Sequence, residues 1–260
     1  MLTPPVELDL EKMLLAIAMM AIAAGLSVWQ KLGLAGSLAI ATVRSIVQLV
    51  IVGYLLDAVF DLKQPVVILL VVLVMSAIAS VEARHRIGKK VPFVLPLVWL
   101  SVVVGAGTIL AYTTAIVVRP GVWYAPQYLI PLAGMILGNA MNGASIAAEK
   151  LTAALSDRAR EIETHLSLGA TAQQAIAAYE SDAIKTAMIP SINGMMVVGL
   201  VTLPGMMTGQ ILGGVSPLLA IRYQLVILFA ITASNLITSL FVTKAIARQF
   251  FTPAQQLKQF

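Results

Sequence analysis

The chain has 260 residues, of which 59% are hydrophobic and only 11% are charged. This balance excludes an ordinary soluble domain and predicts an all-α protein that crosses a lipid bilayer several times. Basic residues that accumulate on one side of a membrane protein account for the net charge of +5, so nucleic-acid binding is not expected. Because the chain has no cysteine, disulfide and thiolate chemistry are excluded.

Membrane-spanning helices are predicted wherever about 20 mostly apolar residues follow one another, since that length crosses a hydrocarbon core about 30 Å thick. Glycine, proline and charged clusters separate such windows. About seven windows qualify, at residues 13–29, 34–56, 65–81, 91–118, 128–148, 187–207 and 223–245. We therefore expect one polytopic transmembrane domain over residues 1–260.

The basic residues near the ends of the spans predict the orientation, because Lys and Arg accumulate on the cytoplasmic side. With the N-terminus outside and the C-terminus in the cytoplasm, most of them lie inside. These are Lys31, Arg84, Arg86, Lys89, Lys90, Lys150, Arg158, Arg160, Lys185, Lys244, Arg248 and Lys258. Lys12, Lys63, Arg119 and Arg222 then lie outside. The cytoplasmic (inner) membrane is the expected location.

In the second window, Arg44 and Gln48 lie one helical turn apart. An arginine near the bilayer centre costs about 2.5 to 3.5 kcal/mol even on insertion scales, so its head requires water, a partner or a ligand. A structural role, such as capping backbone carbonyls of a broken helix, is one interpretation. The other is that Arg44 and Gln48 contact an anionic substrate or a metal carried by an anionic chelator.

The fifth window carries polar side chains that mark either a substrate path or contacts between helices. Asn139, Asn142 and Ser145 share one broad helical face. Gly134 and Gly138 lie four residues apart beside it, a spacing that permits close helix packing. Both interpretations stay open here, whereas packing is favoured for polar residues of the seventh window. Those are Ser234, Asn235, Thr238 and Ser239.

One long polar insertion, residues 149–185, follows the fifth window on the predicted cytoplasmic side. Its apolar residues recur at helical spacing as far as Leu168, Gly169 stops the pattern, and the pattern restarts after Thr171, which is suited to cap a helix. Two helical pieces are expected to meet at a corner. Since a simple turn needs only a few residues, the extra length indicates a docking surface.

The sixth window contains Asn193, for which a substrate path and a contact between helices are again both possible interpretations. It also contains several methionines. Met188, Met195 and Met206 return to nearly the same side of one helix. Thioethers are soft ligands, better suited to Cu(I) than to Fe(II), and they are also flexible fillers of surfaces that repack. The filler interpretation is favoured, with Met195 and Met206 along the predicted path, and ligation of a metal stays unknown.

Three stretches of the sequence resemble one transporter family across nearly the whole chain. They are "GMILGNAMNGASIA", "LGATAQQA" and "MIPSINGMMVVGLVTLPGMMTGQILGG". These stretches are similar to the permease subunits of the Fet-type iron exporters and of the plant aluminium-sensitivity transporters, which are ATP-binding cassette (ABC) systems. The resemblance implies that this chain is the permease and that a separate ATPase subunit drives export.

The resemblance also implies where that ATPase docks. Permeases of ABC systems insert a cytoplasmic corner into a groove of the ATPase, and Glu163 and Gly169 stand at the spacing of the Glu-Ala-Ala-x-x-x-Gly loop of importer permeases. Thr164 and His165 replace the two alanines, and Asp182 stands where the proline of that loop would fall. An analogous docking element is therefore expected. Its predicted residues are Glu163, Leu166, Leu168, Gly169 and Ala170.

The chain contains no G-x-x-x-x-G-K-[ST] motif, so we expect it to be no enzyme and to bind no cofactor, with ATP and Mg²⁺ used by the partner. The resemblance implies export of iron or a metal chelate, and a homodimer is the expected assembly. Export of an anionic metabolite such as a nucleotide sugar, an ion-coupled secondary transporter and a channel are the alternatives. Acidic residues lie only in tails, loops or near span ends, which disfavours ion coupling.

Overall fold

The computed structural model describes residues 9–62, 64–87 and 93–258. These residues form α-helices and one π-helix, and no β-strand occurs among them. The all-α prediction is therefore confirmed. Lys63, Lys89 and Lys90, which entered the orientation argument, and the first residues of the window 91–118 lie outside the described residues. The chain divides into two compact units.

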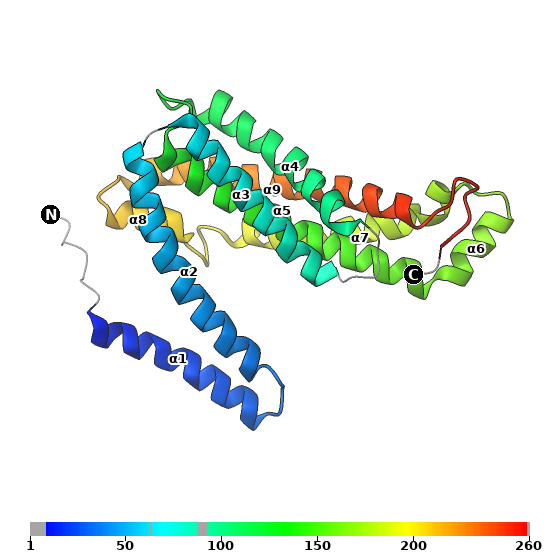
Figure 1. The fold of residues 1–260 in the computed structure, drawn as a ribbon, viewed down its shortest axis with the longest axis horizontal. Coiled ribbons are helices and arrows are strands. Elements are labelled where there is room, and N and C mark those ends of the chain that lie inside the picture. Colours follow the sequence, from blue (N-terminus) through cyan, green and yellow to red (C-terminus); the bar gives the residue numbers. More distant parts are fainter. Residues whose placement is uncertain (1–8, 63, 88–92, 259–260) are drawn as a thin grey trace. The chain divides into compact units, whose positions relative to one another are not determined.

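The first unit contains the helices α1 (Leu10–Trp29) and α2 (Ala35–Leu62), which pack on each other as a helical hairpin (Figure 1). Gly33 makes the connecting turn possible with a φ of +72°. The Ser27 hydroxyl, which is buried, accepts a hydrogen bond of 3.0 Å from the Leu34 N–H and so fixes the two ends of the turn. Most apolar side chains of both helices are exposed in the chain, as expected for lipid-facing surfaces.

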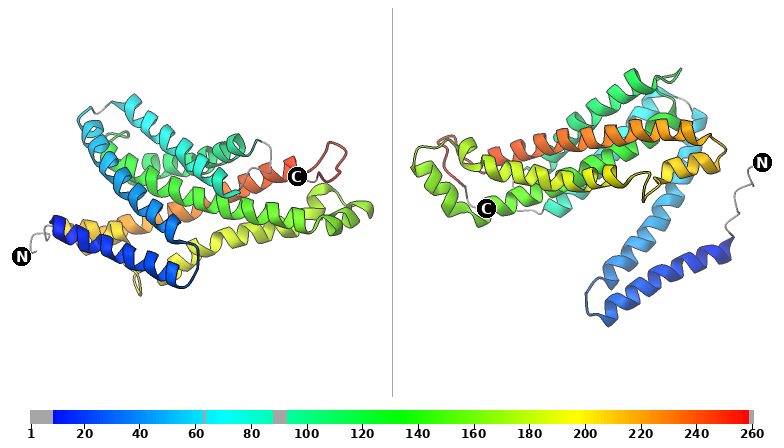
Figure 2. Two further views of the ribbon diagram at one scale, coloured as in Figure 1. Left: turned by 60° about the horizontal axis from the view of Figure 1, so that its bottom comes forward. Right: turned by 180° about the vertical axis from the view of Figure 1, so that it is seen from behind.

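The second unit is a helical bundle in which α5 and α9 pack along each other, with α3, α4 and α7 against them (Figure 1). The chain runs in one direction along α5 and α9 and in the opposite direction along α7 (Figure 2). Its helices are α3 (Pro65–Ile87), α4 (Val94–Tyr112), the π-helix η1 (Thr113–Val118), α5 (Pro126–Asp157), α6 (Ala159–Ser167), α7 (Ala172–Val197), α8 (Gly205–Leu212) and α9 (Pro217–Gln249).

Two glycines allow the closest helix contacts of this bundle. A Cβ at Gly105 in α4 would lie 2.8 Å from the backbone nitrogen of Thr238 in α9, nearer than real Cβ contacts come. Gly143 in α5 faces Asn235 in α9, whose side-chain amide occupies the space that a Cβ would need. Thr238 and Asn235 are both buried, which agrees with the packing interpretation of the polar residues in the last helix.

The spacing of Gly134 and Gly138 predicted a close approach at a different place on α5. A Cβ at Gly134 would lie 3.3 Å from the end of the Met75 side chain in α3, and a Cβ at Gly138 would meet nothing within 4 Å. The structure therefore supports that prediction only in part, at Gly134. A glycine pair predicts close packing only when a facing helix lies against it, and spacing within one helix contains no information on this point.

Among the described residues, six helices are long and apolar enough to cross a membrane. They are Glu11–Trp29, Ala35–Leu62, Pro65–Ile87, Val94–Val118, Pro126–Asp157 and Pro217–Gln249. The chain is thus a multi-pass membrane protein. The expected continuous span over residues 187–207 is wrong, because α7 ends at Val197 and α8 begins only at Gly205. Gly199, with a φ of +81°, turns the chain between them, and its N–H donates to the Thr202 carbonyl at 2.9 Å.

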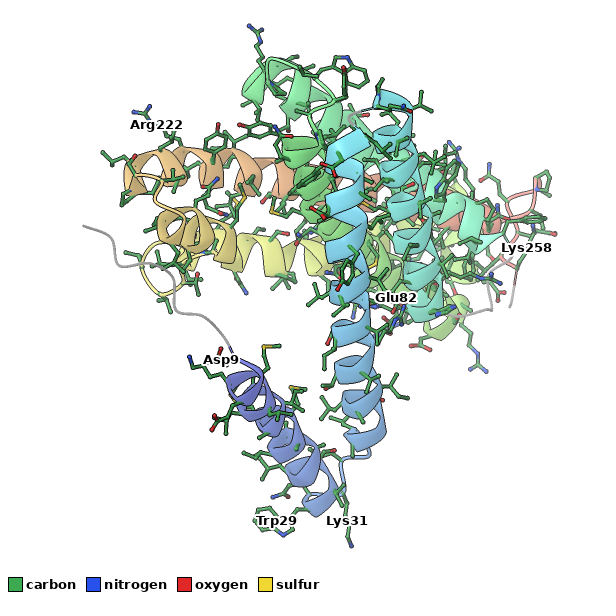
Figure 3. All side chains as sticks on the ribbon, turned by 60° about the vertical axis from the view of Figure 1, so that its left-hand side comes forward. Asp9, Trp29, Lys31, Glu82, Arg222 and Lys258 are labelled. Carbon is green, nitrogen blue, oxygen red and sulfur yellow. The ribbon has the colours of Figure 1, made fainter. Side chains whose placement is uncertain are left out.

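Basic side chains gather towards one end of the bundle, where α3, α5 and α9 end and α7 begins. They are Arg84, Arg86, Lys150, Arg158, Arg160, Lys244, Arg248 and Lys258. Arg119 follows η1 and Arg222 lies in the first turns of α9, towards the other end, and Figure 3 shows Arg222 and Lys258 far apart. We call the end with α6 the corner end. Its assignment to the cytoplasm stays a prediction.

Candidate functional site

The predicted corner is formed by α6, a short turn and the start of α7. The turn closes with hydrogen bonds from the Gly169 N–H to the Leu166 carbonyl at 3.0 Å and from the Ala170 N–H to the His165 carbonyl at 3.1 Å. Gly169 adopts a φ of +91°, which favours glycine. Thr171 caps α7 in a capping box with Gln174. The stop at Gly169 and the cap at Thr171 are confirmed, whereas the first helical piece is divided at Arg158 between α5 and α6.

The predicted docking residues differ in how far they protrude from this corner. Leu168 is 81% exposed, a large value for a leucine outside the apolar spans. Glu163 and Gly169 are also exposed, whereas Leu166 and Ala170 are half-buried. At the tip of this polar helical hairpin the Leu168 side chain is accessible to another protein. Leu168 is therefore the most accessible apolar group of the predicted docking set.

Two features of α6 show that it packs against the neighbouring helices α7 and α5. Ile162 in α6 is completely buried, although the charged residues of that helix are exposed. Tyr179 in α7 donates a hydrogen bond to the Glu161 carboxylate, and burial together with this bond raises the pKa of Tyr179. The corner is therefore a supported element and not a free loop. Tyr179 was not part of the sequence argument, because its partner lies on a different helix.

A cavity of about 210 Å³, which we call the polar cavity, lies among α5, α7 and α9. Its polar lining includes Asn139 and Asn142, both predicted as path residues. Three further lining groups, Ser191, Thr232 and Asn235, were not assigned to the path from the sequence. The remaining lining residues are Gly143, Ile146, Ala187, Pro190, Gly194, Leu228 and Ile231. Three helices thus bring neutral polar groups to one partly open space within the bundle.

Asn235 of α9 connects α9 to α7 in the wall of the cavity. Its Nδ2 donates to the Ser191 hydroxyl at 2.8 Å and to the Ala187 carbonyl at 3.3 Å, and its Oδ1 accepts from the Ser239 hydroxyl at 3.4 Å. Pro190 lies between the two acceptors on α7, and a proline inside a helix disturbs the carbonyls that precede it. The amide of Asn235 therefore stabilises α7 beside its proline, and it lines the cavity as well.

Asn142 is held from the side of α3. The Arg86 guanidinium donates to Asn142 Oδ1 at 3.0 Å, and this bond fixes which end of the amide is the acceptor. Asn139 instead donates its Nδ2 to the Met135 carbonyl at 2.8 Å within α5. Arg86 was used in the sequence only to assign the orientation. Its approach to a residue 56 positions later depends on the packing of α3 on α5, which no local pattern indicates.

Two other predicted path residues lie apart from this cavity. Ser145 is buried in α5 and donates to the Met141 carbonyl at 2.8 Å, and it is not among the lining residues. Asn193 is exposed on the outer side of α7. Of the predicted polar face of α5, Asn139 and Asn142 therefore line the cavity and Ser145 does not.

Met195 and Met206 do not share one helical face, because they belong to α7 and α8. The Thr232 hydroxyl donates to Met195 Sδ at 3.2 Å beside the polar cavity. Met206 lines a separate cavity of about 110 Å³, together with Met135 and Gln210. The expected alignment along one continuous helix is wrong, since the break at Gly199 separates the two methionines. The described residues also contain no cluster of three or more His, Asp or Glu side chains that could hold a metal ion.

Met195→Leu and Met206→Leu, made singly, are expected to keep most of the transport activity. Leucine has a similar volume, and such replacements usually cost less than about 1.5 kcal/mol. Transport into sealed vesicles, measured beside ATP hydrolysis by the same preparation, checks this result. Loss of transport with unchanged ATP hydrolysis would instead assign a ligand role to the thioether.

Arg44 and Gln48 lie in α2 and belong to the first unit. Both residues are exposed in the chain, and Arg44 has at least one interaction partner. Their role as substrate contacts stays a prediction.

Comparison with known proteins identifies the family. The model of the "Uncharacterised protein family (UPF0014)" matches residues 10–251. A UPF0014 membrane protein of Synechocystis sp. is 46% identical over 97% of both chains. The probable iron export permease protein FetB of Escherichia coli is 33% identical, over 95% of this chain and 94% of its own. The protein ALUMINUM SENSITIVE 3 of Arabidopsis thaliana is 32% identical, over 94% of this chain and 88% of its own. No solved structure matches. The chain is therefore a member of the UPF0014 family of membrane proteins, to which its resemblance to the iron-export and aluminium-sensitivity permeases pointed.

Proposed function

We propose that this chain is the permease subunit of an ABC exporter in the cytoplasmic membrane and that a separate ATPase drives it. The observation that carries the proposal is the supported corner, where an exposed Leu168 and the turn at Gly169 stand between two fixed helices. A relative named as an iron export permease supports the same role. Since the chain has no phosphate-binding motif, ATP and Mg²⁺ would be bound by the partner.

In this proposal α7 connects docking to transport. It begins at the capped Thr171 beside the corner, and its residues Ala187, Pro190 and Ser191 line the polar cavity. A helix transmits displacement along its axis, and a proline provides a place where it can bend. Binding and release of the ATPase at Leu166, Leu168, Gly169 and Ala170, with Glu163 at the edge, would therefore move one wall of the cavity.

The proposed cargo is iron carried with an anionic chelator, and an anionic metabolite is the second candidate. Among the described residues that line the cavity there is no carboxylate, histidine or thiolate, although hard metal cations prefer oxygen anions. The hydrogen bond from Arg86 to Asn142 Oδ1 leaves the two Nδ2 hydrogens of Asn142 for an acceptor on the cargo. Neutral donors near an arginine favour a ligand that has oxygen acceptors on its surface.

A transport assay tests the function. The full-length permease, purified together with the ATPase that accompanies it, is placed in sealed inside-out vesicles with ATP outside. We expect ATP-dependent, orthovanadate-sensitive accumulation of one member of a panel of free metals, metal chelates and nucleotide sugars. Accumulation that follows a proton or sodium gradient without any ATPase would contradict the proposal and favour a secondary transporter.

Arg44→Gln is expected to abolish the stimulation of ATP hydrolysis by the cargo while the ATPase stays bound. The reason is that glutamine lacks the charge and the planar fork that bind carboxylate or phosphate, and Arg44→Lys should restore only part of the stimulation. ATP hydrolysis is measured with and without cargo in the same vesicles. If Arg44→Gln prevents assembly, Arg44 is structural, and if the variant transports free Fe(II) as well as the parent does, the anionic-cargo idea is wrong.

We also propose that two permease chains form the transporter, since closed two-fold assembly is the commonest arrangement of homo-oligomers. Exposed apolar residues on the bundle, such as Phe229 and Phe241 in α9, leave surface for such a contact or for lipid. Crosslinking in native membranes should yield a dimer. Active vesicles that contain only monomer after crosslinking would exclude the dimer.

A further inference from the structure

A groove of about 840 Å³ lies at the corner end, between the start of α7, the end of α9 and the segment that follows α9. Its floor and walls come from Thr171, Ala172, Gln173, Ile176, Glu180, Lys244, Ala247, Arg248, Phe251, Thr252, Pro253, Gln255 and Lys258. We call it the basic groove. It is separate from the polar cavity, which has no residue in common with it.

The segment after α9 folds back to form one wall of the basic groove. Phe250 is buried at the end of α9, and the Lys258 N–H donates to the Phe250 carbonyl at 2.7 Å. The Gln255 side chain accepts a hydrogen bond of 3.0 Å from the Ala172 N–H at the start of α7. A contact between residues 83 positions apart thus fixes the C-terminal segment beside the corner. The groove is a built feature of the fold.

Positively charged side chains outnumber negatively charged ones in the lining of the basic groove. Lys244, Arg248 and Lys258 are exposed along it, and Glu180 is the acidic residue of its lining. Burial raises the pKa of Glu180 above its ordinary value, while the nearby Lys244 acts in the opposite direction. None of the ion pairs found among the described residues includes these three cations. The groove therefore offers positive charge to an incoming acidic group.

The position of the groove along α7 favours a partner from the aqueous phase. Lys185 is the last charged residue before the apolar part of α7, and it marks the expected edge of the hydrocarbon. Ala172 lies 13 positions earlier, about 20 Å away along the helix axis. The headgroup layer on one side of a bilayer is only about 5 to 8 Å thick. For a helix that runs along the membrane normal from this edge, most of the groove would lie beyond the depth of lipid headgroups.

We infer that the basic groove binds an acidic segment of the ATPase, as a second contact beside the corner. Thr171 and Ala172 line the groove and directly follow the docking residues Gly169 and Ala170, so one protein seated on the corner meets both surfaces. This inference rests on the proposed function. It adds that the C-terminal segment belongs to the docking surface and that charge attraction contributes to binding there.

The test reverses two charges of the groove. Arg248→Glu and Lys258→Glu are combined in the full-length permease, which is reconstituted in phosphatidylcholine nanodiscs. Affinity for the ATPase that copurifies with the unaltered chain is measured at several salt concentrations. The double variant should bind at least about tenfold more weakly and with a smaller salt dependence, because opposite charges steer and hold the partner. Glu180→Gln, which removes the opposing carboxylate, should bind more tightly than the parent.

Arg222→Glu is the matched control, because Arg222 is an exposed arginine of the same helix at its other end. It should leave affinity and salt dependence unchanged, and thermal unfolding of all variants verifies that they are folded. Equal affinity of the double variant and the control overturns the inference. If the double variant loses binding of phosphatidylglycerol in mixed nanodiscs and keeps the ATPase, the groove is a lipid site and the inference is likewise wrong. If the unaltered chain binds no ATPase, the proposed function fails instead.

Discussion

Gly143→Ala should destabilise the bundle by about 2 to 4 kcal/mol, the sum expected for overpacking a core and losing buried hydrogen bonds. A Cβ at this position would occupy the space of the Asn235 amide. That amide cannot simply turn away, because it is buried and donates to Ser191 and to the Ala187 carbonyl. The added methyl group therefore has to separate α5 from α9 or free the proline-containing part of α7.

Gly138→Ala provides the matched control on the same helix. A Cβ at Gly138 meets nothing within 4 Å, and alanine is the better helix former, so this variant should be as stable as the parent or slightly more stable. Thermal unfolding in detergent, followed by the loss of monodisperse protein, compares the two variants. Equal midpoints for Gly143→Ala and Gly138→Ala would contradict the close contact between Gly143 and Asn235.

Gly169→Val should abolish recruitment of the ATPase to membranes. At a φ of +91° a β-branched residue is strained, and even a favourable left-handed conformation costs a non-glycine residue about 1 to 2 kcal/mol. No atom lies within 4 Å of the position of a Cβ at Gly169, so the change acts through the backbone and not through a clash. The turn would relax towards an ordinary conformation and redirect Leu168 away from the proposed groove of the ATPase.

Gly199→Val is the matched control, because it separates the effect of backbone strain from an effect on the docking surface. Gly199 has a φ of +81°, and a Cβ there also meets nothing within 4 Å, but it lies in the turn between α7 and α8. Similar strain is therefore introduced outside the docking surface, and recruitment should persist. Recruitment is measured as the ATPase retained on washed membranes, with permease content determined in parallel. Unchanged recruitment and unchanged ATP hydrolysis with Gly169→Val would remove the corner from the docking surface.

The corner was predictable because its determinants are local. A glycine that ends one helical pattern and a threonine that begins the next lie within three residues, and their roles depend on backbone conformation and a neighbouring glutamine. The same locality explains why most spans were predicted correctly, since each needs only its own apolar residues. The family resemblance rests on equally local strings.

The cavity could be predicted only in part, because its walls meet through packing. Asn139 and Asn142 were found from one helical face, but the partners of that face are Asn235 on α9 and Arg86 on α3. Whether a buried asparagine bridges helices or lines a space depends on which residue faces it, and a sequence does not state this. Gly143 was the available signal, since a glycine beside two asparagines leaves space for a side chain from another helix.

The window 187–207 failed for a different reason. Its average hydropathy hides Gly199 and the turn around it, and the helix that enters the window, α7, is polar over the residues that precede it. An average treats the residues of a window as interchangeable, whereas one glycine with a positive φ is enough to end a helix. The alignment predicted for Met195 and Met206 depended on that continuous helix and was lost with it.

The break between α7 and α8 leaves two helices that are not among those long and apolar enough to cross a membrane. Their polar groups find partners mainly on α9, through Asn235 and Thr232. Because α9 is synthesised after α7, these contacts can form only once α9 is present. The packing of this part of the bundle is therefore completed after translation of the last helix, and a nascent chain truncated before Pro217 lacks these contacts.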